Sequence, residues 1–403
     1  MNSKRLIAIL LLFIASALAY TAEIQKINVK GLIKTKKSHV QKILEPFYGM
    51  EATDDVLMEI EGELQAEGIF ESVKVEYIDQ TPDILVTVKE KITFIPLPFV
   101  SYSEGKWGGG GMLLNMNAFG NKTTVVAGVI YSGGKLITVL LLSKPPVGVG
   151  DYGGSFLTSY TNFNSELTAL NGDTAADYSM KSGWLMGTVQ KKIGEDSTIS
   201  LGLGYEFKKL NGTLLGQDLN NNFQLINMNL GWSLQKDEWN GWFLSSKGLS
   251  FKIDTGYSPT HREFCHTATC GATLQFPLTQ RLRFVGGGSS FYGKDIHITN
   301  YAGGSSASVS ILPSAFVSSN LVGLNAGFEV ATVKFGFGLL SLYGNFQTCV
   351  VEDFDQKQKV NSGFAFGTRL YLSKIAFPAL SIGYSYNLTT RTPIFSGALG
   401  ISM

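Results

Sequence analysis

Residues able to do covalent chemistry are few in this 403-residue chain. Its four histidines are His39, His261, His266 and His297, and it has no Gly-x-Ser-x-Gly nucleophile motif. No two carboxylates stand at a spacing suited to acid–base catalysis. The glycine run 108–111 is not followed by the Gly-Lys-Ser/Thr of a phosphate-binding loop. We therefore expect neither enzyme activity nor a cofactor.

The three cysteines, Cys265, Cys270 and Cys349, are too few and odd in number for a multi-disulfide framework. In a continuous strand, Cys265 and Cys270 would face opposite sides of a sheet, so a disulfide would need a turn between them. The neighbouring His261 and His266 make a metal site the alternative, but their spacing matches no standard ligand pattern. We expect a loop or strand end here and no metal.

The composition excludes two classes of protein for the fold that positions these residues. Charged residues are 16% of the chain and the net charge is +1, so no basic stripe is available for nucleic acid. Apolar residues are 44%, yet after the N-terminus no run approaches the eighteen or so that a membrane-spanning helix needs. A helical membrane protein is therefore not expected.

The N-terminus has the pattern of a secretory signal. Lys4 and Arg5 precede the apolar stretch 6–15, and the small residues at 17–19 suit a signal peptidase. An uncleaved anchor helix is the alternative. The sequence thus divides into a signal peptide at 1–19, a small periplasmic domain at 20–92 and a barrel at 93–403.

The segment after the signal is rich in charge and has both helical and strand periods. A strand ending at Gly31 precedes a helix over 36–44 with Thr35 as its cap, and a second helix starts at the N-cap Asp54 and ends before Gly68. Two alternating strands follow, at 73–75 and 84–88. The predicted order is β-α-α-β-β, an α+β domain.

The remaining three-quarters of the chain alternate apolar with small or polar residues. The segments 199–207, 228–234 and 380–388 are examples of this period-two pattern. With a secretory signal, many such strands are typical of an outer-membrane barrel whose apolar side chains face lipid. The predicted fold is mainly β, a transmembrane antiparallel barrel, and typical strand and loop lengths give about sixteen strands, with fourteen or eighteen as alternatives.

Loops and tryptophans complete the predicted barrel. The polar stretches 159–177 and 293–319 are long enough to be extracellular loops. Trp184, Trp232 and Trp242 are candidates for the aromatic girdles at the two membrane surfaces, with ordinary packing as the alternative.

The C-terminus resembles the sorting strand of outer-membrane proteins. Phe395, Leu399 and Gly400 are placed as in that strand, although Met403 replaces the usual closing aromatic residue. The preceding stretch 377–385 resembles the penultimate strand of the BamA/TamA-like superfamily.

Two further segments and the N-terminal domain extend this resemblance over nearly the whole mature chain. They are 117–120 at the start of the barrel and the strand 324–333, which bears Glu329. The predicted β-α-α-β-β unit resembles a single POTRA domain, which presents a sheet edge to an extended client strand. The resemblance implies that unfolded outer-membrane or secreted polypeptides are clients.

One motif of that superfamily is missing. Its sixth extracellular loop normally carries an arginine that enters the lumen and meets an acidic residue on a later strand. Here no arginine occurs between Arg283 and Arg369, and the loop region reads Val-Ser-Ile-Leu-Pro-Ser at 309–314. Asn345 stands at the expected acidic position, so both halves of the pair are absent and the lumen lock is degenerate, with Glu329 and Asn345 in its region.

We therefore expect a protein of the cell outer membrane, with its N-terminal domain in the periplasm. It would assist polypeptide insertion or translocation by adding client strands to the POTRA-like sheet and to a seam between the first and last barrel strands. Besides clients, the expected partners are outer-membrane lipid and periplasmic chaperones or lipoproteins. The alternative is a passive channel or structural surface barrel. The predicted seam residues are Phe99, Tyr102, Phe395, Gly397, Leu399, Gly400 and Met403.

Overall fold

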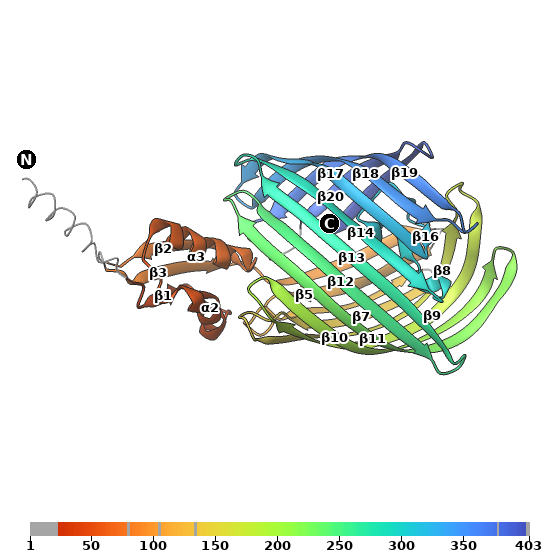
Figure 1. The fold of residues 1–403 in the computed structure, drawn as a ribbon, viewed down its shortest axis with the longest axis horizontal. Coiled ribbons are helices and arrows are strands. Elements are labelled where there is room, and N and C mark those ends of the chain that lie inside the picture. Colours follow the sequence, from red (N-terminus) through yellow and green to blue (C-terminus); the bar gives the residue numbers. More distant parts are fainter. Residues whose placement is uncertain (1–22, 79–80, 104–105, 133–134, 377–378, 400–403) are drawn as a thin grey trace, which may run out of the picture.

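The computed structural model describes residues 23–78, 81–103, 106–132, 135–376 and 379–399. The predicted signal at 1–19 and the seam residues Gly400 and Met403 lie outside the described residues. A small α+β domain precedes a large β-barrel, which confirms the predicted fold class (Figure 1). No described helix has the length and apolar character needed to cross a membrane.

The N-terminal domain has the predicted β-α-α-β-β order. A three-stranded sheet with the order β1-β3-β2 packs against two helices, and β1 is parallel to β3 while β2 is antiparallel to it. Val40, Leu44, Ile60 and Leu64 are fully buried against the sheet. The elements are β1 (Ile27–Lys30), α2 (Lys37–Leu44), the short 3-10 helix η1 (Glu45–Phe47), α3 (Asp54–Ala66), β2 (Phe70–Tyr77) and β3 (Ile84–Glu90).

The helix caps differ from the prediction. Lys36 rather than Thr35 is the N-cap of α2, and Thr53 rather than Asp54 caps α3, accepting a hydrogen bond from the Val56 amide. Thr35 makes tertiary contacts instead, because its hydroxyl accepts a hydrogen bond from Asn117 Nδ2 at 2.9 Å. Asn117 lies in the barrel, so a residue with a local capping preference is used to join the two domains.

The barrel is one sixteen-stranded sheet with neighbours in chain order. All ladders between its described strands are antiparallel, and Figure 1 shows the sheet curled into a barrel of tilted strands. The strands are β4 (Phe94–Ser103), β5 (Lys106–Asn115), β6 (Thr124–Ser132), β7 (Lys135–Lys144), β8 (Tyr152–Thr168), β9 (Thr174–Lys192), β10 (Ser197–Leu214), β11 (Gln217–Trp239), β12 (Leu244–Ser258), β13 (Glu263–Pro277), β14 (Leu282–Lys294), β17 (Asn320–Phe335), β18 (Gly338–Glu352), β19 (Gln358–Leu372), β20 (Leu380–Asn387) and β21 (Thr392–Leu399).

Side-chain alternation separates an apolar outside from a polar inside. Leu203 on β10 is 63% exposed and Leu230 on β11 is 58% exposed, whereas their neighbours Gly202 and Asn229 are buried. A water-soluble sandwich would bury the leucines and expose the polar residues. The observed orientation is that of strands surrounded by lipid, with backbone groups satisfied by neighbouring strands.

The stretch 159–177 is predicted to be a loop, and the structure shows this to be wrong. Strands β8 and β9 occupy most of it, and only 169–173 form the connection. Ala176, Tyr178 and Met180 are buried on the inner side and pack with Leu167. Beyond the membrane belt the strands keep their alternation, but their outer face contacts water and their apolar side chains face inward. The outward-facing polar residues therefore give this part of the sequence the composition of a loop.

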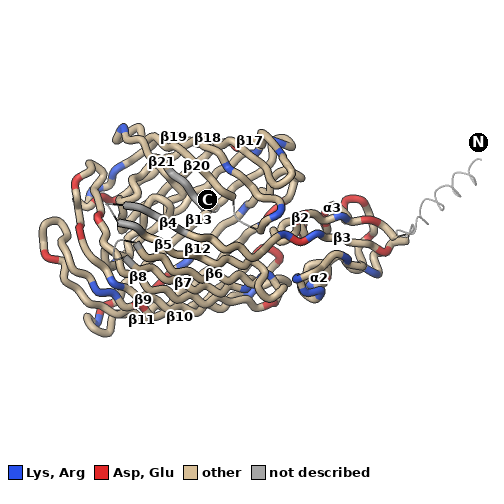
Figure 2. The backbone as a smooth tube through the Cα atoms, turned by 180° about the vertical axis from the view of Figure 1, so that it is seen from behind, with Lys and Arg blue, Asp and Glu red and all other residues tan. Residues whose placement is uncertain are grey.

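The N-terminal domain docks on the connections at one end of the barrel, which we name the domain-side end; the opposite end is the far end. The Lys36 amide donates to Gly120 O at 2.7 Å, and Lys42 on α2 pairs with Asp151 at 2.6 Å. Figure 2 shows the blue lysines around α2 and the red carboxylates of α3 on different parts of the domain.

A partly buried carboxylate, 17% exposed, also joins the domain to the barrel. Glu67, after α3, lies 3.0 Å from His39 Nε2 and 3.3 Å from Nζ of Lys122, which belongs to the β5–β6 turn. Burial alone would raise the pKa of Glu67, but Lys122 and His39 outweigh it and lower that pKa to about 2. The ionised carboxylate is therefore the form that holds the domain in place.

Acid should release this contact. Because the pKa of Glu67 is lower in the docked state, its contribution is complete above about pH 4.5 and is lost as the pH falls towards 2. Lys122 belongs to the barrel and His39 to the domain itself, so only the part of the shift that Lys122 causes contributes to docking. Glu67→Gln should loosen the domain at neutral pH, measured as a broader distance distribution between spin labels on α2 and β6. Glu61→Gln, on the exposed side of α3, should leave it narrow; equal broadening would refute the role of Glu67.

Candidate functional site in the barrel lumen

The connection between β14 and β17 folds into the barrel instead of standing out from the far end. It contains η2 (Ile298–Asn300), β15 (Ala302–Gly303), η3 (Gly304–Ala307) and β16 (Val317–Ser318). Its apolar residues are almost fully buried, with Ile311 and Phe316 at 0% exposure. They form a cluster with the inward-facing Leu321 of β17 and Val351 of β18. We name residues 304–316 of this connection the lumen loop.

Neutral hydrogen bonds hold the lumen loop to the barrel wall. The Ser310 amide donates to Gln347 Oε1 at 2.7 Å, and the Ser310 hydroxyl lies 2.6 Å from that of Ser385. Asn387 Nδ2 donates to Ile311 O at 3.0 Å. Gln347 in turn donates to Asn345 Oδ1 at 3.0 Å. The loop region without an arginine thus occupies the lumen and meets amide and hydroxyl partners.

Two inward-facing glycines make room for the loop. A Cβ on Gly323 of β17 would lie 2.2 Å from Ala307 O, and one on Gly363 of β19 would lie 2.1 Å from Tyr386 O of the neighbouring strand and 3.0 Å from the side chain of Ile311. Real Cβ atoms essentially never lie as close to another atom as the first distance. The loop backbone therefore sits directly on the wall, and any side chain at Gly323 would displace it.

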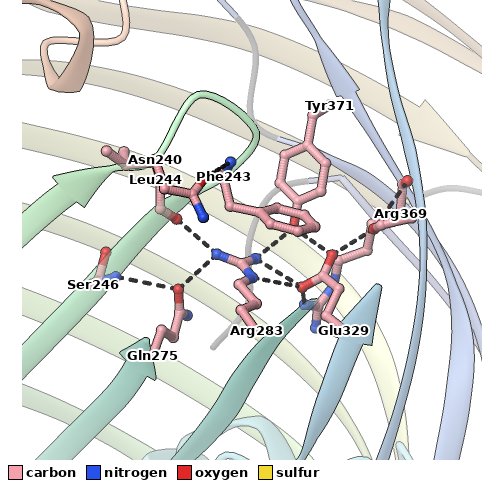
Figure 3. Close-up of polar contacts among 10 residues, drawn as sticks. Asn240, Phe243, Leu244, Ser246, Gln275, Arg283, Glu329, Arg369 and Tyr371 are labelled. Carbon is pink, nitrogen blue, oxygen red and sulfur yellow. Dashed lines mark hydrogen bonds and ion pairs between the residues drawn. The ribbon is translucent and has the colours of Figure 1, made fainter. Parts of the chain in front are cut away.

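A buried ionic cluster lies towards the domain-side end of the same lumen. Glu329 on β17 is 0% exposed, and its Oε2 lies 2.7 Å from Arg283 Nη2 and 2.8 Å from Arg369 Nη1 (Figure 3). The hydroxyls of Tyr371 and Ser341 donate to its Oε1. Two arginines share one carboxylate, so the cluster carries one net positive charge.

The β11–β12 turn covers this cluster. Arg283 Nη1 donates to Leu244 O at 2.7 Å and to Gln275 Oε1 at 3.0 Å, and its guanidinium lies 4.4 Å from the ring centroid of Phe243. Tyr371 packs edge-on against Phe243 with centroids 6.0 Å apart. The network therefore connects β11–β12 with β14, β17 and β19, as Figure 3 shows.

The two predicted lumen residues belong to different parts of the lumen. Glu329 is the centre of the ionic cluster, whereas Asn345 supports Gln347 beneath the lumen loop. Sequence reasoning did not identify Arg283 and Arg369 as partners of Glu329. The signal that could have found the first pair is strand alternation, because Arg283 and Glu329 each stand between two apolar residues of their strands.

The predicted seam strands form the two edges of the sheet. β4 and β21 stand at the ends of the strand order, and the described residues include no ladder between them. Phe99 and Tyr102 pair through their backbones with Gly110 and Trp107 of β5. On β21, Gly397 and Leu399 pair with β20, and Phe395 is 82% exposed.

The tryptophans and cysteines are placed as follows. Of the three predicted girdle tryptophans, Trp232 faces outward, while Trp184 pairs with Glu206 on the inner side and Trp242 lies in the β11–β12 turn. Cys265 and Cys270 lie on the continuous strand β13, on its inner and outer faces, and are unbridged. No group of three or more metal-ligating side chains occurs within the described ranges.

Comparison with known proteins identifies the fold. No family model and no curated protein matches the sequence. Among solved structures, CdiB from Escherichia coli is 12% identical with a TM-score of 0.60, covering 94% of this chain and 74% of CdiB. CdiB from Acinetobacter baumannii is 15% identical with a TM-score of 0.52, covering 95% of this chain and 72% of CdiB. BamA from Haemophilus ducreyi lacking POTRA domains 1–3 is 14% identical with a TM-score of 0.47, covering 94% and 83%. At these identities, the two CdiB structures show a shared fold.

Proposed function

We propose that this protein assists the insertion or translocation of polypeptides at the outer membrane. The N-terminal domain would act as a periplasmic POTRA-like domain, and the edge between β4 and β21 would be the seam at which a client strand pairs. Support comes from the CdiB fold, the sequence resemblance to the BamA/TamA-like superfamily, and the lumen loop seated inside the barrel.

The observation that carries this proposal is a pair of prolines on the first barrel strand. Pro96 and Pro98 of β4 lack an amide hydrogen, and both residues still take their places in the ladder with β5. Residues two apart in a strand direct their amides to the same side, so the missing donors fall on the edge away from β5. That edge cannot form a full ladder with β21, which keeps the seam weaker than the other strand pairs.

A covalent seam should abolish the activity. In a variant with serine at all three native cysteine positions, pairs of cysteines would be scanned between 94–98 of β4 and 396–399 of β21, the domain-side halves of the two edge strands. Oxidation of a reactive pair should stop the protein from accelerating the folding of a client barrel in liposomes, and reduction should restore it. The control is a pair at Tyr384 and Phe395, partners across the β20–β21 ladder. Oxidised seam variants that still accelerate folding would rule out the seam mechanism.

The same reconstitution separates the alternative function. A passive channel would conduct ions without changing the folding rate of the client. If the wild-type protein conducts ions but does not accelerate client folding, the proposed function is wrong and the fold assignment stands.

A further inference from the structure

Positive charge is concentrated on one arc of the domain-side end. The stretches 275–283, 329–341 and 369–376, which form the ends of β13, β14, β17, β18 and β19, contain five cations and one carboxylate, Glu329. The cations are Arg281, Arg283, Lys334, Arg369 and Lys374. Figure 2 shows blue segments at this end of the barrel.

The other domain-side connections are nearly neutral. The stretches 115–124, 143–153, 190–198 and 235–247 together contain six cations and five carboxylates. The side-chain contacts of the N-terminal domain with the barrel, to Asn117, Lys122 and Asp151, fall on this neutral part. The chain leaving the domain contacts the positive arc only through backbone hydrogen bonds of Ile92 with Lys374 and Ala376, and no ion pair of the described residues joins the domain to the arc.

Trp242 holds two of these cations together at the surface. The Arg281 guanidinium lies 4.6 Å and Lys334 Nζ 5.2 Å from the centroid of the indole ring. Lys334 Nζ also donates to Gly241 O at 3.3 Å. Both cations are exposed, and within the described part of the chain neither forms an ion pair. The guanidinium donors of Arg281 thus remain available to a carboxylate. We name Arg281, Trp242 and Lys334 the cationic clamp.

The cationic clamp faces the opening of the lumen rather than the lipid. After the irregularity between Ala331 and Val333, Lys334 pairs with Leu339, which is buried on the inner side. Trp242 packs against the inner cluster formed by Phe243, Ala331 and Leu339. Behind the clamp, the net positive ionic cluster around Glu329 adds to the field in a region of low dielectric constant.

We propose that the cationic clamp binds an acidic segment of an unfolded polypeptide as it reaches the barrel. A carboxylate can accept hydrogen bonds from Arg281 and be attracted by Lys334, while the partly exposed ring of Trp242 packs against an apolar neighbour in the client. This assignment rests on the proposed function, since it names the class of client segment that the domain-side opening prefers. The inward orientation favours a polypeptide over the phosphate of a membrane lipid.

Peptide binding to the intact protein tests the proposal. The full chain would be placed in phosphatidylcholine nanodiscs and titrated with a labelled peptide of Asp, Glu and Phe, and with its Asn/Gln/Phe counterpart. Arg281→Gln combined with Lys334→Gln should weaken binding of the acidic peptide about tenfold, equivalent to about 1.4 kcal/mol, and leave the neutral peptide unchanged. Added salt should weaken only the acidic peptide.

The matched control removes two cations from the neutral part of the same end, Lys191→Gln with Lys236→Gln. Acidic binding that survives in the clamp variant, or that falls equally in the control, would overturn the proposal. Loss of acidic binding when phosphatidylglycerol is added to the nanodiscs would instead identify the site as one for lipid phosphate. If wild-type protein accelerates client folding but does not bind the acidic peptide, only this inference is wrong. If it binds the acidic peptide but does not accelerate client folding, only the proposed function is wrong.

Discussion

Replacing Glu329 with glutamine should lower the free energy of unfolding of the barrel by about 3–5 kcal/mol. Arg283 is 1% exposed and Arg369 is mostly buried, so neither can turn to water when the carboxylate charge is lost. Two positive charges would then face each other in a buried network whose donors have lost their shared anion. Unfolding by urea in detergent micelles, followed by tryptophan fluorescence, measures the change.

Two comparisons make this result specific to the buried cluster. Asp254→Asn breaks the 2.7 Å ion pair with Lys252, in which the lysine is 46% and the aspartate 26% exposed, and should cost at most about 1 kcal/mol. Replacing the three charges together, with leucine at Glu329 and methionine at Arg283 and Arg369, should recover much of the loss. A Glu329→Gln variant as stable as Asp254→Asn would show that the cluster does not hold β14, β17 and β19 together.

Replacing Gly323 with leucine should open the lumen and raise the single-channel conductance several-fold. The new Cβ would lie 2.2 Å from Ala307 O, so the lumen loop must leave the wall, and the bonds of Ser310 and Ile311 would go with it. With the apolar cluster around Phe316 displaced, water and ions gain a path through the barrel. Planar bilayer recordings with the purified protein measure the change.

The control for this variant is Gly344→Leu on β18. Gly344 faces outward, as do the exposed Leu342 and Phe346 two residues before and after it. A Cβ added to Gly344 would lie 4.0 Å from its nearest neighbour, Ala365 O. It should leave the conductance at the wild-type value. If Gly323→Leu inserts poorly, Gln347→Ala, which removes the acceptor of the Ser310 amide, provides a milder second variant. Unchanged conductance in both lumen variants would mean that the loop does not close the barrel.

The lumen therefore has two kinds of internal support. Near the far end, the lumen loop is held by Gln347, Ser385 and Asn387, which are neutral and can exchange their hydrogen bonds with water if the loop moves. Near the domain-side end, the contacts of Glu329 are ionic and buried, and breaking them is costly. We expect the loop to be the mobile part and the wall from β12 to β19 to be the rigid part.

The sequence alone determined the fold class, because side-chain alternation is a local property. Period-two segments such as 199–207 specify strands with one apolar face, and the length of the region divided by a typical strand and loop length predicted about sixteen of them. The helical spacing of Val56, Ile60 and Leu64 likewise predicted the second helix of the N-terminal domain. Alternation could not reveal where the strands end, and for that reason the loop predicted at 159–177 is wrong.

Only the tertiary structure decided how polar residues far apart in the chain combine. Glu329 meets Arg283 and Arg369 because β14, β17, β18 and β19 are neighbours whose register places these three side chains on the inner face at the same level. Thr35 bonds to Asn117 rather than capping its helix because docking places them together. The Ser310 amide donates to Gln347 because burial of Ile311 and Phe316 places the loop inside the barrel. Each pairing is selected by the cost of leaving buried polar groups unsatisfied, and that cost exists only once the barrel encloses them.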